Sequence, residues 1–330
     1  RISQFAAEFV RDFRDHMDSD PAVPNLQVHH FGYMYLADSE RFESRLRDSY
    51  VVQAACGVGT RLMSPDEIAT AYPFYKLDDI VLGSHNTVDE GYFDGATMFD
   101  WWRRKARQRG VCYIANEVVA LGSDASRVIS VTLASGTIIS TGTLINAAGT
   151  RAARVAKLAG LEIPIEPRPR YTFVFDAADP PDRAVPLTVD SSGVHFRTDG
   201  QYFMAGCPPI QDGPVDCDNF AVDHSLWQEK AWPAIANRVP TFERARLVNS
   251  WVGHYAYNRL DQNAVIGPHP DLPNFIFVNG FSGHGFQQSP AMGRGVSELV
   301  TYGEFRSLDM TPLGLERIIT GRPLVEYAVI

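Results

Sequence analysis

Three glycines lie within six residues near the C-terminal end of the chain, at Gly280, Gly283 and Gly285. They separate the apolar residues 274–279, which predict a buried strand, from residues 290–302, which predict a helix that ends at Gly303. Glycine lets a backbone approach another group closely. A strand, a glycine loop and a helix in this order favour a fold built from strand–turn–helix units, with backbone amides available to a ligand beside the loop.

The start of this helix is predicted from Ser289 and Pro290. Serine suits the N-cap of a helix, and proline suits the first helical position. The N-terminus of a helix carries partial positive charge, so the helix would point this charge at a ligand in the loop. Glycine-rich corners that only cap a helix are also common in α/β folds. The residues alone leave both interpretations open.

A second strand–turn–helix unit is predicted at residues 143–158. Its strand runs into Ala147, Ala148 and Gly149, and a helix follows to Leu158. A corner of small residues exposes backbone amides and suits a phosphate or a ribose. No G-x-G-x-x-G occurs in the sequence, so the usual phosphate-binding loop of a dinucleotide-binding domain is missing from it.

Further elements are predicted from periodicity and caps. Ser64, Pro65 and Glu67 form the pattern of a capping box. Helices are predicted at residues 2–17, 39–57, 65–72 and 94–110. Strands are predicted at residues 26–36, 111–115, 117–121, 128–133 and 138–145.

The middle of the chain, residues 164–267, has a different character. Prolines and aromatic residues are frequent, and strand patterns surround one helix at residues 224–238. This is typical of an antiparallel sheet with turn-rich connections. We therefore predict an α/β (α+β) chain of two interleaved domains. The nucleotide-binding domain comprises residues 1–22, 83–162 and 268–330, without a G-x-G-x-x-G unit, and the antiparallel-sheet cap or substrate domain comprises residues 23–82 and 163–267.

Composition excludes several classes of function. A net charge of −9 argues against nucleic acid, which requires a basic face. No stretch of eighteen uncharged apolar residues occurs, so we predict no transmembrane segment. The four cysteines are far apart and form no CxxC pair, so we predict neither a metal site nor a disulfide framework. Because the sequence opens with Arg1, any targeting signal is expected upstream of it.

Four stretches occur in the same order as in the D-amino-acid oxidase and sarcosine oxidase (DAO) family of FAD-dependent flavoenzymes, which the chain resembles over nearly its whole length. They are residues 89–94, 145–149, 163–167 and 280–290. Further runs resemble a mitochondrial branch of this family that acts in the assembly of respiratory complex I. These runs are residues 62–66, 238–243 and 261–270.

The resemblance implies FAD bound by a discontinuous Rossmann-like domain beneath an antiparallel sheet. It implies that the backbone near Val118 contacts the adenine, and that Ala147, Ala148 and Gly149 lie beside the ribose and pyrophosphate. It further implies that the isoalloxazine ring is lined by Gly280, Ser282, Gly283, His284, Gly285, Phe286 and Gln287. Because the sequence has no G-x-G-x-x-G, we expect the chain by itself to bind FAD weakly.

Two departures from the family concern the flavin tether and the substrate. Bacterial sarcosine oxidases attach FAD through a cysteine, and His254 aligns at that position, from which we predict a non-covalent role in cofactor binding. The same enzymes place a lysine in the glycine loop to meet the substrate carboxylate, and this chain has Gln287. The family's lysine contact to a substrate carboxylate is therefore absent at this position.

Candidate catalytic residues are Tyr255, Tyr257, His284 and Gln287. Tyr255 and Tyr257 share one face of a predicted strand and either line a substrate pocket or pack as core aromatics. His284 is expected to orient the loop rather than to transfer a proton. Arg197 either binds an anion or lies at the surface. No acid–base triad is required, because a flavin accepts the hydride.

The sequence therefore predicts an FAD-dependent oxidoreductase that acts on CH–NH or CH–NH2 groups of a small amine or amino acid. The resemblance places it in mitochondria, in the matrix or peripherally on the inner membrane, with subunits or assembly intermediates of respiratory complex I as partners. One alternative is an active sarcosine, glycine or D-amino-acid oxidase or dehydrogenase with no assembly role. Others are a non-catalytic flavoprotein scaffold and an α/β module without a cofactor.

Overall fold

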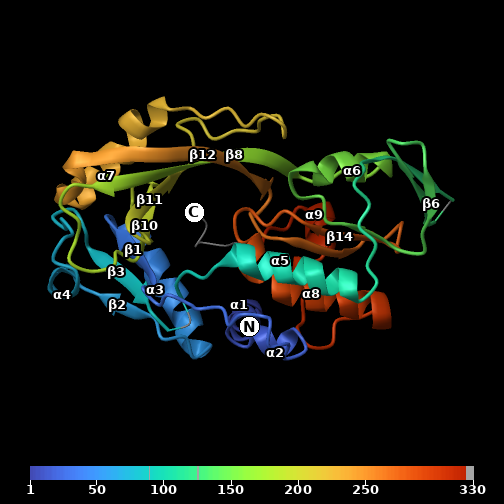
Figure 1. Cartoon of the computed structure of the whole chain (residues 1–330), viewed down its shortest axis with the longest axis horizontal. Helices are drawn as coiled ribbons and strands as arrows, with labels where there is room; N and C mark the ends of the chain where they lie inside the picture. The colour runs from blue at the N-terminus through green and yellow to red at the C-terminus, as the bar shows by residue number, and fades with distance from the viewer. Residues whose placement is uncertain (89, 125, 325–330) are drawn as a thin grey trace.

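A computed structural model describes residues 1–88, 90–124 and 126–324 (Figure 1). Asp89, in the family motif at residues 89–94, lies outside the described residues. The helices are α1 (Ile2–Arg11), α2 (Phe13–His16), α3 (Glu40–Ala55), α4 (Pro65–Ala71), α5 (Gly95–Gln108), α6 (Ala152–Leu158), α7 (Trp232–Arg238), α8 (Gly285–Tyr302) and α9 (Glu316–Thr320). Shorter helical turns are Gly149–Arg151, Trp227–Ala231, Pro240–Arg244 and Thr311–Leu313.

A sheet of eight strands forms one side of the molecule (Figure 1). Its order is β12 (Ala245–Asn258), β8 (Ile165–Ala177), β11 (Tyr202–Cys207), β10 (His195–Asp199), β9 (Leu187–Val189), β1 (Tyr33–Ala37), β3 (Leu82–Asn86) and β2 (Arg61–Met63). Neighbouring strands are antiparallel except β1 and β9, which are parallel. Strands β8 and β12 form the longest ribbon, and this ribbon extends towards the opposite side.

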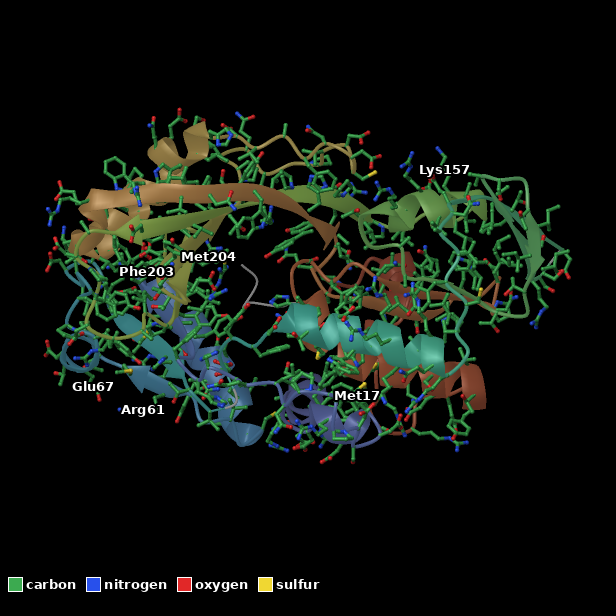
Figure 2. The ribbon with its side chains drawn as sticks, viewed as in Figure 1. Met17, Arg61, Glu67, Lys157, Phe203 and Met204 are labelled. Atoms are coloured by element: carbon green, nitrogen blue, oxygen red, sulfur yellow. The ribbon has the colours of Figure 1, made fainter. Side chains whose placement is uncertain are left out.

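An aromatic core supports this sheet. The Phe242 ring lies 5.1 Å from that of Phe175 and 4.8 Å from that of Phe203, measured between centroids. Phe203 and Met204 are successive residues of β11 (Figure 2), and their side chains therefore point to opposite faces. Phe203 enters the aromatic core, whereas Met204 lines the cleft described below.

The opposite side, called here the nucleotide side, contains two smaller sheets. One has the order β13 (Val265–Pro268), β14 (Phe275–Asn279), β7 (Leu144–Asn146), with β14 and β7 parallel. The other has the order β4 (Val118–Ser123), β5 (Val128–Leu133), β6 (Ile138–Ser140). Helices α1, α5 and α8 also lie on this side (Figure 1). The mixture of helices, antiparallel strands and a parallel pair confirms the predicted α/β (α+β) class.

Local helix signals were predicted correctly. The Ser64 hydroxyl accepts from the Glu67 amide at 3.3 Å, and the Glu67 carboxylate accepts from the Ser64 amide at 2.8 Å, which completes the capping box of α4. The Asp94 carboxylate accepts from the Thr97 amide at 3.1 Å and caps α5. The helix predicted at residues 2–17 is interrupted at Asp12 and forms α1 and α2.

Three predicted strands are wrong in part or entirely. The strand predicted at residues 26–36 is regular only from Tyr33, where β1 begins. The strand predicted at residues 138–145 is divided, because β6 and β7 belong to different sheets. Residues 111–115 form no strand and belong to none of the described sheets. Their side chains Val111, Tyr113 and Ile114 are about half exposed.

In the described ranges, no helix combines the length and the apolar character needed to cross a bilayer.

Candidate active site

A cleft of about 690 Å³ lies between the eight-stranded sheet and the nucleotide side. Side chains from α1, β1, β10, β11 and β12 line it, together with the loop that leads into α8. A cavity of this size suits a small organic ligand or part of a cofactor. Of the predicted site residues, Tyr255, Ser282, Gly283, His284 and Gln287 lie in its wall.

The glycine loop is held against β12 by hydrogen bonds. The Ser282 amide donates to the Ala256 carbonyl at 3.1 Å. The Ser282 hydroxyl accepts from the Asn258 amide at 3.0 Å. Ser282 itself has φ +50°, a conformation that residues other than glycine seldom adopt. These contacts fix the loop to the sheet side of the cleft.

Each glycine of this loop lies close to a protein side chain, and its approach to a ligand stays a prediction. A Cβ atom at Gly280 would lie 2.4 Å from the Ile165 side chain. At Gly283, which has φ +104°, it would lie 2.6 Å from the Tyr255 ring. At Gly285 it would lie 3.1 Å from Phe281. Close packing of the loop on these three side chains therefore accounts for the glycines.

Helix α8 begins at Gly285, with His284 as N-cap, so the predicted start at Ser289 and Pro290 is wrong. Pro290 lies inside the helix, where it has no N–H to donate to the Phe286 carbonyl. The Ser289 hydroxyl donates to that carbonyl at 2.6 Å instead. The hydroxyl hydrogen bond takes the place of the missing backbone one, and α8 extends on the N-terminal side of Pro290. Its first amides therefore lie at the cleft, beside Gln287.

The two candidate tyrosines occupy different positions. Both share one face of β12, and arginine guanidinium groups lie over their rings, Arg170 at 4.8 Å from Tyr255 and Arg168 at 3.9 Å from Tyr257. Tyr255 lines the cleft and Tyr257 does not. Burial raises the pKa of the Tyr255 phenol, so this group stays protonated at neutral pH.

His254 projects from the face of β12 opposite to Tyr255, as the alternation of a strand requires. Its ring stacks on Phe220 with centroids 4.5 Å apart. Its Nε2 atom lies 2.8 Å from the Asn219 carbonyl oxygen. His254 is not among the residues that line the cleft.

The residues predicted for the adenosine half of the cofactor lie elsewhere on the nucleotide side. Val118 begins β4, and Ala147 and Gly149 are exposed at the corner after β7. The Asn146 side chain organises this corner by accepting from the Ala148 amide at 3.2 Å. None of these residues lines the cleft. Phe286 is partly exposed and stacks on Phe93, at 5.9 Å between centroids.

Glu90 is a cleft residue that the sequence did not identify. The Asn86 side chain and the Tyr33 backbone amide donate hydrogen bonds to its carboxylate. Burial outweighs both hydrogen bonds and raises the pKa of Glu90 to about 7. A carboxyl group with this pKa can exchange a proton near neutral pH, which is a common property of catalytic acids and bases.

His195 and Arg197 project from β10 into the same cleft. Burial, with the positive charges of Arg197 and Arg170, lowers the pKa of His195 to about 4. Among the described residues, the buried Nδ1 atom of His195 has no hydrogen-bond partner. Arg197 is buried rather than at the surface, and its Nη1 atom donates to Thr198 and Asp199, both at 2.8 Å. The fold brings His195 and Arg197 to the same cleft as Glu90. No local sequence signal links these residues, so sequence reasoning could not group them.

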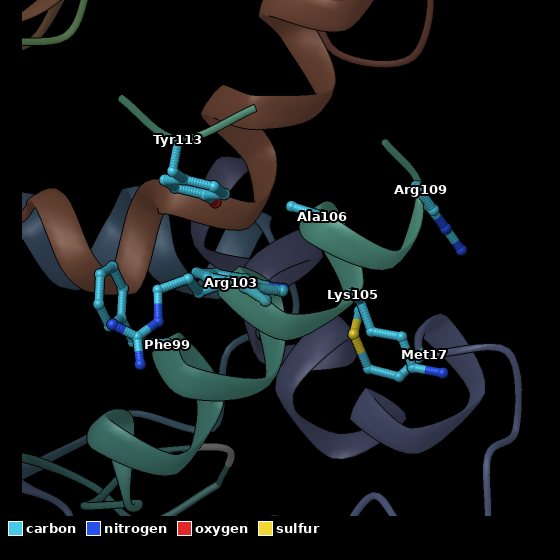
Figure 3. A pocket seen from close by; sticks show the side chains of 8 residues that line it. Met17, Phe99, Arg103, Lys105, Ala106, Arg109 and Tyr113 are labelled. Atoms are coloured by element: carbon cyan, nitrogen blue, oxygen red, sulfur yellow. The ribbon is translucent and has the colours of Figure 1, made fainter. Parts of the chain in front are cut away.

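A smaller hollow of about 380 Å³ lies along α5 (Figure 3). Its lining includes Phe99, Tyr113 and the basic side chains Lys105 and Arg109. Lys105 is 2.8 Å from Asp20, and Arg109 is 2.6 Å from Asp18. Because acidic partners already neutralise these basic side chains, the hollow is a weaker candidate than the cleft for binding a charged ligand.

Asp216, Cys217 and Asp218 have potential metal-ligating atoms within 4.8 Å of one another. Asp218 already forms an ion pair with Arg151. A carboxylate neutralised by arginine is a weaker candidate for a metal ligand, so we assign no metal to this group.

Comparisons with known proteins agree on one family. The family described as "DAO: FAD dependent oxidoreductase" matches residues 1–299. "FAD-dependent oxidoreductase domain-containing protein 1" of Xenopus laevis is 34% identical, across 100% of this chain and 72% of the relative. The mitochondrial sarcosine dehydrogenase of Mus musculus is 23% identical, across 82% of this chain and 31% of the relative.

The solved structures give the same fold. The crystal structure of L-proline dehydrogenase from P. horikoshii matches with a TM-score of 0.84 at 22% identity, across 97% of this chain and 83% of that one. At this level of identity the similarity establishes the fold alone.

Proposed function

This chain belongs to the DAO family of FAD-dependent oxidoreductases, and we propose that it oxidises a C–N bond of a small amine or amino acid bound in the cleft. The observation that supports this proposal is that two sets of residues face the same cleft from opposite sides. The start of α8 and the glycine loop form one wall, and Tyr255, His195 and Arg197 from the sheet form the other. This arrangement suits a flat cofactor on one side and a substrate on the other.

The isoalloxazine half of FAD fits the loop wall. The first amides of a helix have no partner within the helix, and His284 caps α8 without a side-chain hydrogen bond to these amides. Their partial positive charge would stabilise the negative charge that a flavin acquires on reduction. We therefore propose that Gly283, His284 and Gln287 lie beside the ring, with Gly280, Ser282, Gly285 and Phe286 supporting the loop.

Non-covalent binding of FAD is the form that we propose. His254, the residue aligned with the family's flavin-linking cysteine, stacks on Phe220 on the outer face of β12. A bond from His254 to a flavin in the cleft would require the side chain to leave this position. For the adenosine half, we propose contacts with Val118 and the exposed corner at Ala147, Ala148 and Gly149.

Arg197 is our candidate for recognition of a substrate carboxylate. Its guanidinium lies 4.3 Å from the centre of the Tyr92 ring, at the cleft wall, and its hydrogen bonds to the described residues use Nη1 rather than Nη2. A positive group here compensates for Gln287, which carries no charge. Bound FAD supplies the chemistry by accepting a hydride from the substrate carbon. Tyr255 and Arg197 would orient the substrate. Tyr257 would support Tyr255 through Arg170, whose guanidinium lies over both tyrosine rings.

Anaerobic flavin reduction tests this function. The protein is incubated with FAD, and N-methylglycine, L-proline, glycine and D-alanine are added in turn while the flavin absorbance is recorded. We expect bleaching by at least one of them, and Arg197→Gln should weaken its apparent binding at least tenfold. Arg103→Gln, an exposed residue of α5 outside the cleft, is the matched control and should not change it. An oxidised spectrum that none of these compounds alters would overturn the proposal.

A second candidate function is a flavoprotein that acts in the assembly of respiratory complex I in mitochondria. The replacement of the family's lysine by Gln287 favours it, because assembly does not require turnover. Deletion of the gene should reduce assembled complex I on native gels, and re-expression should restore it. Rescue by a variant such as Arg197→Gln would separate an assembly role from catalysis, whereas no loss of complex I on deletion would exclude that role.

The domain division remains a proposal. We assign residues 1–22, 83–162 and 268–330 to the FAD-binding domain and residues 23–82 and 163–267 to the substrate domain. The strands of the large sheet fall within the second set except at β3, which extends to Asn86. Limited proteolysis in the connecting segments, with and without FAD, would test this division.

A further inference from the structure

We propose that Glu90 accepts the proton that a substrate ammonium group must lose before its C–N bond is oxidised. This inference rests on the proposed function and assigns a role within it. An ammonium nitrogen has no lone pair, so the adjacent carbon cannot lose a hydride to form an iminium ion. A group in the cleft that removes this proton therefore prepares the substrate for oxidation.

The chemical balance of the two steps is simple. In the first step an N–H bond of the ammonium breaks, its electron pair stays on nitrogen, and the proton forms an O–H bond on Glu90. In the second step the C–H bond breaks, the hydride passes to the oxidised flavin, and the nitrogen lone pair forms the C=N bond. The oxidant is the flavin of the proposed function, and Glu90 later releases its proton to solvent.

Glu90 is held firmly at the cleft wall. Its neighbour Tyr92 forms an antiparallel bridge with His29, in which the His29 amide donates to the Tyr92 carbonyl at 2.7 Å and the Tyr92 amide donates to the His29 carbonyl at 3.2 Å. Gly91 lies so close to His29 that a Cβ atom would be 1.9 Å from the His29 carbonyl oxygen. The backbone on the C-terminal side of Glu90 is therefore fixed beside β1.

The surroundings of Glu90 favour proton exchange. Asn86 and the Tyr33 amide donate to the carboxylate from β3 and β1, which positions it without neutralising it. Burial raises its pKa from 4.5 to about 7. This makes it roughly 300-fold more basic than an ordinary glutamate. Transfer from an ammonium group to Glu90 is easier by the same factor.

Several of the other ionisable groups in the cleft are less suited to this role. The ionisable side chains that line the cleft besides Glu90 are Arg11, His30, Tyr33, Tyr35, His195, Arg197, Tyr255 and His284. Burial raises the pKa values of Tyr33 and Tyr255, so both phenols keep their protons near neutral pH. With a pKa of about 4, His195 is a weaker base than Glu90. Arg197 has no basic site and would repel an ammonium group away from itself, whereas Glu90 would attract it.

Infrared difference spectroscopy tests the proton transfer without turnover. Full-length protein without added FAD is titrated between pH 5 and pH 9 with and without N-methylglycine, and the C=O band of a protonated carboxyl group is followed. We expect a band that appears as the pH falls through about 7 and shifts when N-methylglycine binds in the wild-type protein, and we expect it to be absent in Glu90→Gln, which keeps the side-chain length and one oxygen acceptor. Glu117→Gln, exposed on the nucleotide side, is the matched control and should retain the band.

Flavin reduction distinguishes the two proposals. With FAD bound, the reduction rate of the wild-type protein should rise with pH through an inflection near 7, and Glu90→Gln should lose this inflection and about 100-fold of the rate at pH 7. An infrared band without flavin reduction would support the role of Glu90 and overturn the proposed function. Flavin reduction with an unchanged pH profile in Glu90→Gln would overturn the role of Glu90 alone. A band that persists unchanged in Glu90→Gln would assign it to another carboxyl group and overturn the role of Glu90.

Discussion

The two sides of the molecule differ in how completely they bury their apolar residues. In the described part of the chain, the eight-stranded sheet has one large cluster of buried residues that extends from Met34 to Phe242, and a small one made of Ala37, Leu46 and Leu82. The nucleotide side divides its buried residues among separate smaller clusters. It also leaves Val111, Tyr113 and Ile114 about half exposed. The sheet side is therefore expected to supply most of the stability, and the nucleotide side to depend more on bound ligand.

Truncation of a core side chain is the strongest test of whether the sheet side supplies most of the stability. Phe242→Ala removes a fully buried ring that contacts Phe175 and Phe203. We expect it to lower the free energy of unfolding by about 3–5 kcal/mol, measured by urea denaturation. Ile114→Ala, on the nucleotide side, should change it by less than about 0.5 kcal/mol. Equal losses in the two variants would show that the exposed segment is buried in solution.

Acid should weaken the sheet wall of the cleft. The folded pKa of His195, about 4, lies below its ordinary value of 6.5, so the unfolded chain binds the extra proton between these two pH values. Stability should therefore fall as pH drops from about 6.5 to 4, by up to about 3 kcal/mol from this group. Urea denaturation at pH 7 and pH 5 would measure the loss. His195→Gln should be less sensitive to pH in this range than the wild type.

Alanine substitutions at two glycines with positive φ separate the cost of backbone strain in the loop from the cost of a steric clash. Gly283→Ala places a Cβ against the Tyr255 ring at φ +104°, and we expect a loss of about 1–3 kcal/mol. Gly136→Ala has φ +84° and open space around its Cβ, so only the conformational cost of about 1 kcal/mol remains. Thermal denaturation of both variants gives the difference. A larger loss in Gly136→Ala would contradict the packing assigned to the loop.

Helix caps provide the smallest and most even comparison. Ser64→Ala removes the cap of α4 on the sheet side, and Asp94→Ala removes the cap of α5 on the nucleotide side. Each should cost about 1 kcal/mol in urea denaturation. A much smaller effect of Asp94→Ala would indicate that α5 is already partly frayed in the protein without cofactor.

Sequence predicted those features of the fold that neighbouring residues determine. The capping box at Ser64 and Glu67 depends on side chains three residues apart, so residue type and spacing were sufficient. The prediction of a strand at residues 111–115 was wrong. A strand needs a neighbouring strand to hydrogen-bond with, and the sequence pattern does not show whether one is present. The predicted start of α8 was wrong because the Ser289 hydroxyl donates the hydrogen bond that Pro290 cannot. This contact is visible only in the helical geometry.

The candidate site was only partly predictable for the same reason. The glycine loop is contiguous in sequence, and its wall of the cleft was identified. Glu90, His195 and Tyr33 come from three separate segments, and no spacing between them is fixed along the chain. Their ionisation behaviour depends on burial by the assembled sheet, so it became visible only in the structure.

The contact between Gly283 and Tyr255 has a consequence for evolution. Because the ring occupies the space of a Cβ at position 283, that position cannot gain a side chain while the tyrosine ring is kept. A lineage that loses the tyrosine ring gains room for a side chain in the loop, and one that acquires a side chain there must first shrink residue 255. Among relatives, these two positions should therefore covary, with glycine at 283 wherever 255 is aromatic.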